Sequence, residues 1–388
     1  MPAAATTASV HRSGIRTAFE LANATPGTIH LELGEPDFPT PAHVVEAADA
    51  AARAGRTGYT SNLGIPELRA ALATKLRTRN GIEATADQVV VTHGATQGLL
   101  AVLRALVDPG DGVLVPDPGW PNYRSMTEAV HGTVQPYALR PEAGYVPRVA
   151  DVERALTPRS RVLLLNSPSN PLGSMLDEAT LAELVELARA HDLWVVGDEC
   201  YEDIAFGGPV PVTARFDADE RVVSVFSFSK SYAMTGWRVG YVHAPGRLAP
   251  LLSGLQEPLV SCVNTPAQHA ALAALTGPQD VVARMRDSYR DRRDAALAVL
   301  ADAGIPALRP AGAFYLWVDV SAAGLPSAEV ARDLVVERRV AAVAGEAFGP
   351  SGQGALRISL ATAVDDLLEG CRRIGERVNE LAAALPVR

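Results

Sequence analysis

The chain has 388 residues, of which 48% are hydrophobic and 20% charged, and its formal net charge is -9. This composition is ordinary for a folded globular protein and excludes wholesale disorder, while the length predicts two or three domains or lobes. No run of Lys or Arg provides the electrostatic footprint of a nucleic-acid-binding protein. No window approaches the roughly 20 consecutive apolar residues of a membrane-spanning helix, and the N-terminus lacks the apolar stretch of a signal peptide.

The three cysteines, Cys200, Cys262 and Cys371, are sparse and unclustered. This pattern indicates neither a disulfide framework nor the ligand spacing of a zinc site. We therefore predict reduced thiols, a cytoplasmic location and no bound metal.

The N-terminal segment, residues 1–41, is predicted to form an arm that belongs to a smaller domain. A short helical pattern around residues 18–22 precedes a strand-like run at residues 29–33. Residues 34–41 then contain three prolines within six residues. Such a density of proline forbids regular structure, so we predict a loop at the boundary with the main body.

Residues 42–282 alternate between predicted strands and helices and form the predicted large, cofactor-binding domain. Apolar or β-branched runs predict strands at residues 88–92, 112–116, 161–166, 193–197 and 222–226. One helix is predicted at residues 94–106, and another lies between the third and fourth strands with Asp177 as its N-cap. Continuous apolar runs are typical of strands covered on both faces, so the fold class is α/β, with a mostly parallel sheet between helices.

Residues 283–388 have a different character and predict a second, smaller α+β domain. A long charged helix is predicted at residues 284–300, followed by strands at residues 314–320 and 356–360. A final helix is predicted at residues 366–385, because its apolar side chains recur at helical spacing. These side chains form one stripe: Leu367, Cys371, Ile374, Val378 and Leu381.

Reactive side chains directly follow two of the predicted strands, where an open α/β sheet places its ligands. Lys230 comes after residues 222–226. Desolvation there lowers a lysine pKa and makes the neutral amine available as a nucleophile toward carbonyls. Asp198 follows residues 193–197, and a carboxylate in a dry interior needs a partner such as a pyridinium nitrogen. Tyr201 places a phenol near the same site, although each residue alone also suits a surface or salt-bridge role.

A second group of residues could grip a phosphate beside this lysine. Arg238, Ser227 and Ser229 put a cation and two hydroxyl groups around it. Residues 94–98 open a predicted helix after a strand, and free N–H groups at a helix N-terminus bind phosphate. The GxxxG spacing there is not a dinucleotide fingerprint, so an ordinary helix start remains an alternative.

Three loops or strands carry further candidates. Asn170 lies in a proline-stiffened loop, where its amide could donate to a phenolate oxygen. Trp120 and Tyr123 follow the strand at residues 112–116, where an aromatic ring could stack on a planar cofactor. Arg357 lies between apolar residues of the second domain and could bind a carboxylate with both of its terminal nitrogens. Turn, core and strand-surface roles are the structural alternatives.

Together these motifs resemble the class I aminotransferase family of the fold-type-I pyridoxal-phosphate-dependent enzymes. The resemblance spans nearly the whole chain, from about Leu31 to Ser359. It is strongest in SPSNPLG, GDECY, SFSKSYAMTGWRVGY and ALRIS, with support from LGEPDFPTP and GYTSNLGIPELR. It implies pyridoxal 5'-phosphate as the cofactor and transfer of an amino group between an amino acid and a 2-oxo acid, with 2-oxoglutarate as the expected acceptor.

The resemblance also implies a role for each cofactor-binding residue. Lys230 would hold the cofactor through a Schiff base and move a proton between substrate and cofactor. Asp198 would pair with the ring nitrogen, Tyr201 and Asn170 would hydrogen-bond the ring oxygen, and Trp120 would stack on the ring. The phosphate would be held by Ala95 through its backbone, Thr96, Ser227 and Arg238.

Substrate binding and assembly follow from the same resemblance. Arg357 would bind the substrate α-carboxylate, with Gly34 and Asn170 nearby, and the small domain would close over the substrate. Tyr59 would reach the phosphate in the neighbouring subunit, which implies a homodimer with shared active sites. The family usually has a bulkier residue where Gly119 stands, so Trp120 and Tyr123 both remain candidates for the stacking ring.

Three functions compete on this sequence. Transamination is favoured because the residue set is complete, while a lyase or cyclising enzyme on the same scaffold would use the same lysine. A non-catalytic regulator is disfavoured, because fewer than about forty residues precede the first motif, too few for a helix-turn-helix module. Acidic, aromatic and branched-chain substrates all remain open, with aspartate or aromatic substrates favoured by the overall likeness. Arg124 and Arg148 are unranked candidates for binding a second substrate carboxylate.

Overall fold

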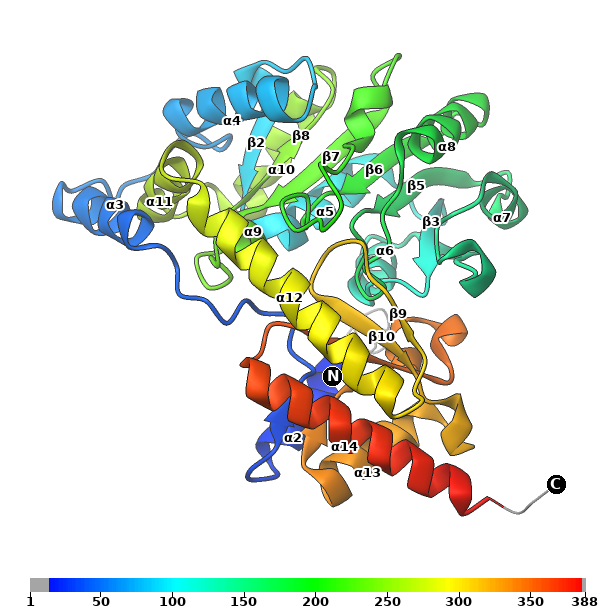
Figure 1. Ribbon diagram of the computed structural model, residues 1–388. Helices are drawn as coiled ribbons and strands as arrows, with labels where there is room; N and C mark the ends of the chain where they lie inside the picture. The colour runs from blue at the N-terminus through cyan, green and yellow to red at the C-terminus, as the bar shows by residue number, and fades with distance from the viewer. Residues whose placement is uncertain (1–13, 386–388) are drawn as a thin grey trace, which may run out of the picture.

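The computed structural model describes residues 14–385 and has two lobes, of which the upper one in Figure 1 is the larger. A seven-stranded sheet forms the centre of that lobe. Its strands are β2 (Val89–Thr92), β3 (Gly112–Asp117), β4 (Thr133–Ala138), β5 (Ser160–Asn166), β6 (Trp194–Asp198), β7 (Val222–Ser227) and β8 (Gly240–His243). The order is β2-β8-β7-β6-β5-β3-β4, and only β8 runs antiparallel to its neighbours, so the prediction of a mostly parallel sheet is confirmed.

Helices cover both faces of this sheet, because successive side chains of each strand point to opposite sides. One face packs against α5 (Gly94–Leu106), α6 (Asn122–Ala129) and α10 (Ala249–Val260). The other face packs against α4 (Pro66–Arg79), α7 (Val149–Ala155), α8 (Glu178–Ala190) and α11 (Thr265–Thr276), with α3 (Ala42–Arg53) beside α11. The predicted α/β architecture, a sheet between two helical layers, is therefore confirmed.

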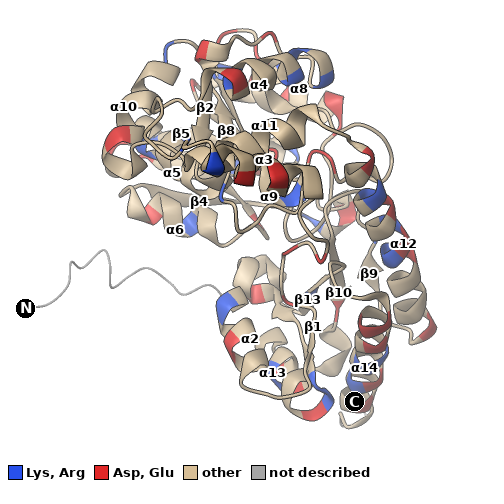
Figure 2. Ribbon diagram, turned by 90° about the vertical axis from the view of Figure 1, so that its left-hand side faces the viewer, with Lys and Arg blue, Asp and Glu red and all other residues tan. Residues whose placement is uncertain are grey.

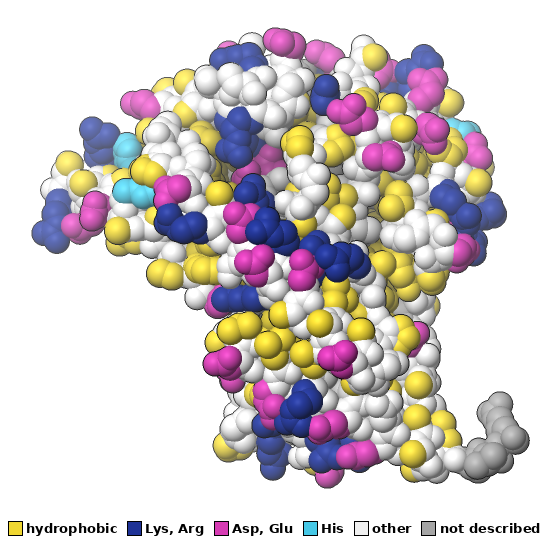
Figure 3. Space-filling model, viewed as in Figure 1, with side chains coloured by type: hydrophobic (Ala, Val, Ile, Leu, Met, Phe, Trp, Pro, Cys, Tyr) yellow, Lys and Arg dark blue, Asp and Glu magenta, His cyan; other side chains and the backbone are white. Residues whose placement is uncertain are grey.

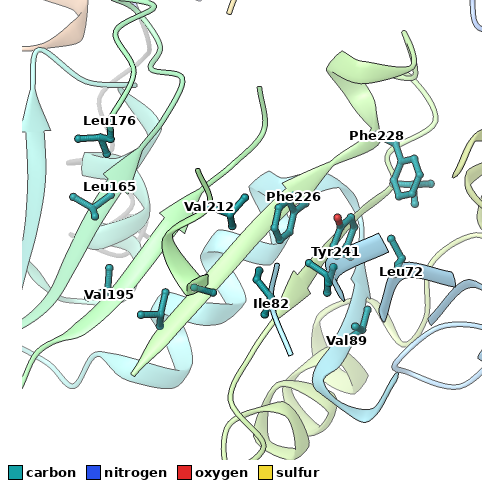
Figure 4. Close-up of a cluster of buried hydrophobic side chains, with 14 of the residues drawn as sticks. Leu72, Ile82, Val89, Leu165, Leu176, Val195, Val212, Phe226, Phe228 and Tyr241 are labelled. Carbon is teal, nitrogen blue, oxygen red and sulfur yellow. The ribbon is translucent and has the colours of Figure 1, made fainter. Parts of the chain in front are cut away.

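The second helical layer buries a continuous group of apolar side chains, which Figure 4 shows in part. Phe226 of β7 and Tyr241 of β8 lie side by side there, with their ring centroids 4.7 Å apart and the rings nearly parallel. Leu72 of α4 packs in the same cluster. This packing fixes the end of β7 from which the lysine-bearing segment leaves the sheet.

The lower lobe is built around a four-stranded antiparallel sheet of order β12-β13-β10-β9. Its strands are β9 (Ala307–Leu308), β10 (Tyr315–Asp319), β12 (Val343–Ala344) and β13 (Ala355–Ser359). β1 (Ile29–His30) pairs in parallel with β11 (Val340–Ala341), which brings the N-terminal segment into this lobe. The helices of the lobe are α2 (Gly14–Asn23), α13 (Ser327–Arg338) and α14 (Val364–Ala383). The apolar stripe predicted for the last helix is buried at Leu367, Cys371, Ile374 and Val378.

A single long helix, α12 (Asp280–Asp302), connects the lobes and runs diagonally between them in Figure 1. Its outer surface carries charges of both signs, which Figures 2 and 3 show interspersed along it. The predicted boundary between residues 282 and 283 falls in the first turn of this helix, so the exact division into domains stays a prediction. Within residues 14–385 no helix combines the length and apolarity needed to cross a bilayer.

Candidate active site

A cavity of about 250 Å³ lies at the carboxyl ends of β5, β6 and β7, between residues of the two lobes. All the residues predicted to bind the cofactor or the substrate α-carboxylate, except Tyr59, line it. These residues are Gly34, Ala95, Thr96, Trp120, Asn170, Asp198, Tyr201, Ser227, Lys230, Arg238 and Arg357. The structure therefore brings together side chains that are far apart in the sequence, as the strand-end rule predicts.

Lys230 lies in the short helix α9 (Phe228–Ser231), which directly follows β7. Its Nζ donates a hydrogen bond to the carbonyl oxygen of Gly34 at 2.6 Å. Burial lowers the pKa of this amine to about 8, and the positive charges of Arg238 and Arg357 act in the same direction. Roughly a tenth of the amine is therefore neutral at pH 7 and able to attack a carbonyl, far more than for an ordinary lysine.

Asp198 ends β6 and is only 4% exposed. Its carboxylate accepts hydrogen bonds from the hydroxyl of Tyr123 at 2.7 Å and from the backbone N–H of Cys200 at 3.2 Å. Burial raises its pKa, and among the described residues no Lys, Arg or His forms an ion pair with it. A buried carboxylate in this state suits a cationic ligand atom such as a protonated ring nitrogen.

The structure shows different surroundings for Trp120 and Tyr123, the two candidates for the stacking ring. Tyr123 is buried and uses its hydroxyl on Asp198, whereas Trp120 is half-buried on the cavity wall with its ring nearly perpendicular to that of Tyr123. Trp120 is thus the better placed of the two to stack on a planar ligand. A Cβ at Gly119 would lie 2.4 Å from the carbonyl oxygen of Pro116, which explains why a bulkier residue does not stand there.

One end of the cavity is built for an anion. Ala95 and Thr96 lie in the first turn of α5, where backbone N–H groups have no partner within the helix. The Arg238 guanidinium lies so close that a Cβ at Gly94 would come within 2.6 Å of its Nη2. Ser227 accepts a hydrogen bond from the backbone N–H of Ser229, which leaves the hydroxyl proton of Ser227 free to donate.

Arg357, on β13 of the small lobe, also lines the cavity and is only 1% exposed. Its Nη1 donates to Asn170 Oδ1 at 3.1 Å and its Nη2 donates to the carbonyl oxygen of Glu32 at 2.5 Å. Burial lowers its pKa, and among the described residues no carboxylate forms an ion pair with it. A buried guanidinium with neutral partners can bind a substrate carboxylate.

The sequence did not single out Tyr315, at the start of β10, although it lines the same cavity. Its hydroxyl oxygen lies 2.9 Å from that of Tyr201. A Cβ at Gly34 would lie 2.2 Å from the Tyr315 hydroxyl, so only glycine fits at that position of the loop. The aromatic pair Phe314-Tyr315 at the start of a predicted strand was the one available signal, and it is equally typical of a core.

Three predicted residues lie outside the cavity. Tyr59 is 91% exposed, so it is available to another molecule and does not contact the cavity of its own chain. Arg148 pairs with Asp151 at 2.9 Å, away from the site. Arg124 lines a neighbouring cavity that shares Trp120 and Tyr123 with the first.

The lining residues fit pyridoxal 5'-phosphate. The cavity contains an anion-binding end, a buried carboxylate without a cation, and an amine of lowered pKa. These features match the phosphate, the ring nitrogen and the aldehyde of that molecule in turn. Among the described residues no group of three or more His, Cys, Asp or Glu side chains could hold a metal ion.

Comparison with known proteins agrees with this geometry. The family model for aminotransferase class I and II matches residues 26–374. An arginine–pyruvate transaminase of Pseudomonas aeruginosa is 40% identical over 90% of each chain, and an aspartate/prephenate aminotransferase of Thermus thermophilus is 38% identical over 92% of each. The structure of Thermus thermophilus aspartate aminotransferase with maleate superposes with a TM-score of 0.93, at 36% identity and covering 97% of this chain and 100% of that one.

This protein belongs to the class I and II aminotransferase family. It is a transaminase of fold type I, as the sequence motifs predicted.

Proposed function

We propose that the transaminase binds pyridoxal 5'-phosphate on Lys230, in the orientation set by the anion-binding residues and by Asp198. When bound, this cofactor supplies an electrophilic carbon and an electron-accepting ring that stabilises negative charge on the substrate α-carbon. Arg238, Ser227 and the first turn of α5, at Ala95 and Thr96, hold its phosphate. Support comes from the absence of any ion pair to Arg238 among the described residues and from the free N–H groups of the helix.

The other lining residues orient the ring and the substrate. Asp198 keeps the ring nitrogen protonated, and Trp120 covers one face of the ring. Asn170 and Tyr201 donate hydrogen bonds to the ring oxygen, a role supported by the fact that both line the same cavity as Lys230 and Asp198. Arg357 binds the substrate α-carboxylate beside Asn170 and Gly34, which leaves the α-hydrogen within reach of the Lys230 amine.

Lys230 is the proposed acid and base of the reaction. Its pKa of about 8 lets it accept a proton at one atom and return it at another near neutral pH. The lysine lies inside a half-enclosed cavity, so bulk water competes poorly for this proton.

We further propose a homodimer in which Tyr59 of each chain completes the phosphate site of its partner. Tyr59 is by far the most exposed of the large hydrophobic side chains in the described part of the chain. A second open cavity, lined in part by His93, Thr235 and Arg238, adjoins the phosphate end and gives a partner residue access to it. The three described cysteines are free, which supports the proposed cytoplasmic location.

The amino acid that serves as donor is proposed only as a class. The cavity is lined by three cationic side chains, each of which already has a proposed role: Lys230, Arg238 and Arg357. The described residues of one chain therefore supply no further cation there for a second substrate carboxylate. We propose 2-oxoglutarate as the first acceptor to test and pyruvate, named for the Pseudomonas relative, as the second.

The observation that carries the proposal is the buried amine of Lys230 between an anion-binding end and an unpaired carboxylate. Purified protein supplied with pyridoxal 5'-phosphate should show visible absorbance that disappears on addition of a good amino donor. A panel of arginine, aspartate, aromatic and branched-chain donors should identify that donor, with amino-acid product measured for each acceptor. Lys230→Ala should lose turnover by at least about three orders of magnitude while keeping the fold.

Two results would overturn this function. One is stoichiometric release of ammonia without any acceptor, which would indicate a lyase on the same scaffold. The other is borohydride fixation of the cofactor on a residue other than Lys230, located by peptide mass.

A further inference from the structure

Tyr201 and Tyr315 form a pair of phenols inside the cavity. Their hydroxyl oxygens are 2.9 Å apart, and their rings meet edge to face with centroids 5.9 Å apart. Tyr201 comes from the segment after β6 in the large lobe, and Tyr315 begins β10 in the small lobe. This hydrogen bond therefore joins the cofactor side of the cavity to the lobe that carries Arg357.

The position of the Tyr315 ring is fixed on several sides. The guanidinium carbon of Arg357 lies 4.4 Å from the ring centroid, and the ring of Phe314 lies 4.9 Å away. Its hydroxyl points at Gly34, where even a methyl group would collide with it. A phenol held this tightly can fix the direction of a hydrogen bond to its neighbour.

Both phenols keep their protons across the neutral range. Burial raises the pKa of Tyr201 well above its ordinary value, and burial also raises the pKa of Tyr315. Each hydroxyl can therefore donate one hydrogen bond. Within the pair one proton is used, which leaves the other for a third acceptor in the cavity. The Arg357 guanidinium, 4.4 Å from the Tyr315 ring centroid, acts to lower the pKa of both phenols, but it ranks directly after burial for Tyr315 and last among the causes for Tyr201. This favours Tyr315 as the donor within the pair.

We infer that Tyr315 is a positioning residue: its hydroxyl donates to Tyr201 and directs the Tyr201 proton toward the ring oxygen of the cofactor. This inference rests on the proposed function and deepens it. A hydroxyl that accepts one hydrogen bond becomes a stronger donor of the next, so the two bonds reinforce each other.

The inference has a spectroscopic consequence with a definite sign. A hydrogen bond donated to the ring oxygen stabilises the negative charge on that oxygen and so disfavours a proton on the nearby Lys230 nitrogen. Loss of the Tyr315 hydroxyl weakens that bond. The pH at which the visible absorbance of the bound cofactor titrates should therefore move upward.

The experiment is a pH titration of cofactor absorbance in holoenzyme variants. Tyr315→Phe keeps the ring and its contacts and should raise the midpoint by roughly 0.3 to 1 pH unit, the scale of one reinforcing hydrogen bond. Tyr201→Phe should raise it more, because the direct donor is lost. Tyr289→Phe is the matched control: it removes a buried phenol hydroxyl that has no partner among the described residues, and it should leave the midpoint unchanged.

The double variant decides whether Tyr315 acts through Tyr201. In the Tyr201→Phe background, Tyr315→Phe should add no further shift, because the residue that it positions is gone. A full additional shift there, or an unchanged midpoint in Tyr315→Phe alone, would overturn the inference while leaving the proposed function intact. Wild-type protein without any cofactor absorbance would instead overturn the proposed function. Thermal unfolding of each variant checks that the fold is retained.

Discussion

The segment from Asp198 to Asp203 has two sides whose charges are satisfied in opposite ways. On the cavity side, the hydrogen-bond donors to Asp198 among the described residues are all neutral. On the other side, Glu202 accepts from Lys75 Nζ at 2.5 Å and from Asn80 Nδ2 at 2.8 Å, and Asp203 pairs with Arg79 at 2.5 Å. Glu199 in the same segment is 1% exposed, and burial raises its pKa to about 8. Among the described residues it has no ion pair, so the segment carries two carboxylates without a cation and two with one.

Lys75 supplies the cation for Glu202 on the side of the segment that faces away from the cavity, called the rear side below. It is 6% exposed, donates a second hydrogen bond to the Tyr241 hydroxyl at 3.0 Å, and lies 4.6 Å from the ring centroid of Phe226. Figure 4 shows the rings of Phe226 and Tyr241 side by side within the buried cluster. The comparison teaches that charges paired within the chain hold the segment in place. Of the two carboxylates without an ion pair, Glu199 is mostly protonated at pH 7 because burial raises its pKa to about 8, whereas Asp198 lines the cavity, where a ligand can supply the cation.

The largest effect on stability should come from breaking the ion pair between Lys75 and Glu202. Lys75→Met leaves Glu202 buried without its cation, or forces it to take up a proton, and should lower the free energy of unfolding by about 3 to 5 kcal/mol. Denaturant unfolding of the apoprotein measures this loss. The folded fraction should keep most of its turnover, because Lys75 does not line the cavity.

The double variant Lys75→Met/Glu202→Met tests whether the loss comes from the orphaned charge. Removing both partners leaves apolar side chains in an apolar cluster, so most of the lost stability should return. Equal instability of the single and double variants would show that the pair itself contributes the stability and would weaken the comparison.

A substitution on the cavity side should lower turnover without lowering stability, the reverse of the effect expected for Lys75→Met. Asp198→Asn keeps one acceptor oxygen for the backbone N–H of Cys200, and its amide N–H can donate to the Tyr123 hydroxyl in place of the bond it now accepts, but it cannot keep a ring nitrogen protonated. We expect turnover to fall by about 10²- to 10³-fold. Because burial raises the pKa of Asp198, its charge destabilises the folded apoprotein above that pKa, and the variant should be as stable as wild type or slightly more so at pH 7.

Asp203→Asn is the matched control, since it makes the same chemical change on the other side of the segment. Its partner Arg79 is 44% exposed, so we expect under about 1 kcal/mol of lost stability and unchanged turnover. Paired measurements of turnover and denaturant midpoint separate the two sides. A loss of stability in Asp198→Asn larger than in Asp203→Asn would contradict the distinction drawn between them.

The strand ends were predictable because they combine two strong local signals. β5, β6 and β7 are apolar runs followed at once by Asn, Asp or Ser, and the edge where these strands meet follows from a parallel sheet. The helix α5 was predicted at its observed bounds, and Asp177 caps α8 by accepting from the N–H of Thr180. β8 was missed because its four residues follow a dense motif and show no periodicity of their own.

The residues missed at the site depend on contacts between segments distant in the sequence. Tyr315 reaches the cavity because β10 pairs with β13 and because the loop at Gly34 has no side chain. Away from the cavity, no local sequence pattern marks Lys75 of α4, and only the packing of that helix on Phe226 and Tyr241 buries it. Pairwise register and helix docking decide such positions, and neither is encoded in a local pattern.

The smallest expected effect concerns the pH at which apoprotein captures its cofactor. With the pKa of Lys230 lowered to about 8, roughly a tenth of the amine is neutral at pH 7 and roughly a hundredth at pH 6. The capture rate should therefore rise about tenfold from pH 6 to pH 7 and level off above about pH 8. An ordinary lysine, with a pKa near 10.4, would keep gaining tenfold in capture rate per pH unit to about pH 10.

Dividing each rate by that of N-α-acetyllysine with the same cofactor removes the titration of the cofactor itself. A ratio that stays constant from pH 6 to pH 10 would show that the cavity does not activate the amine. The contrast between the cavity side and the rear side of the segment from Asp198 to Asp203 would then rest on Asp198 alone.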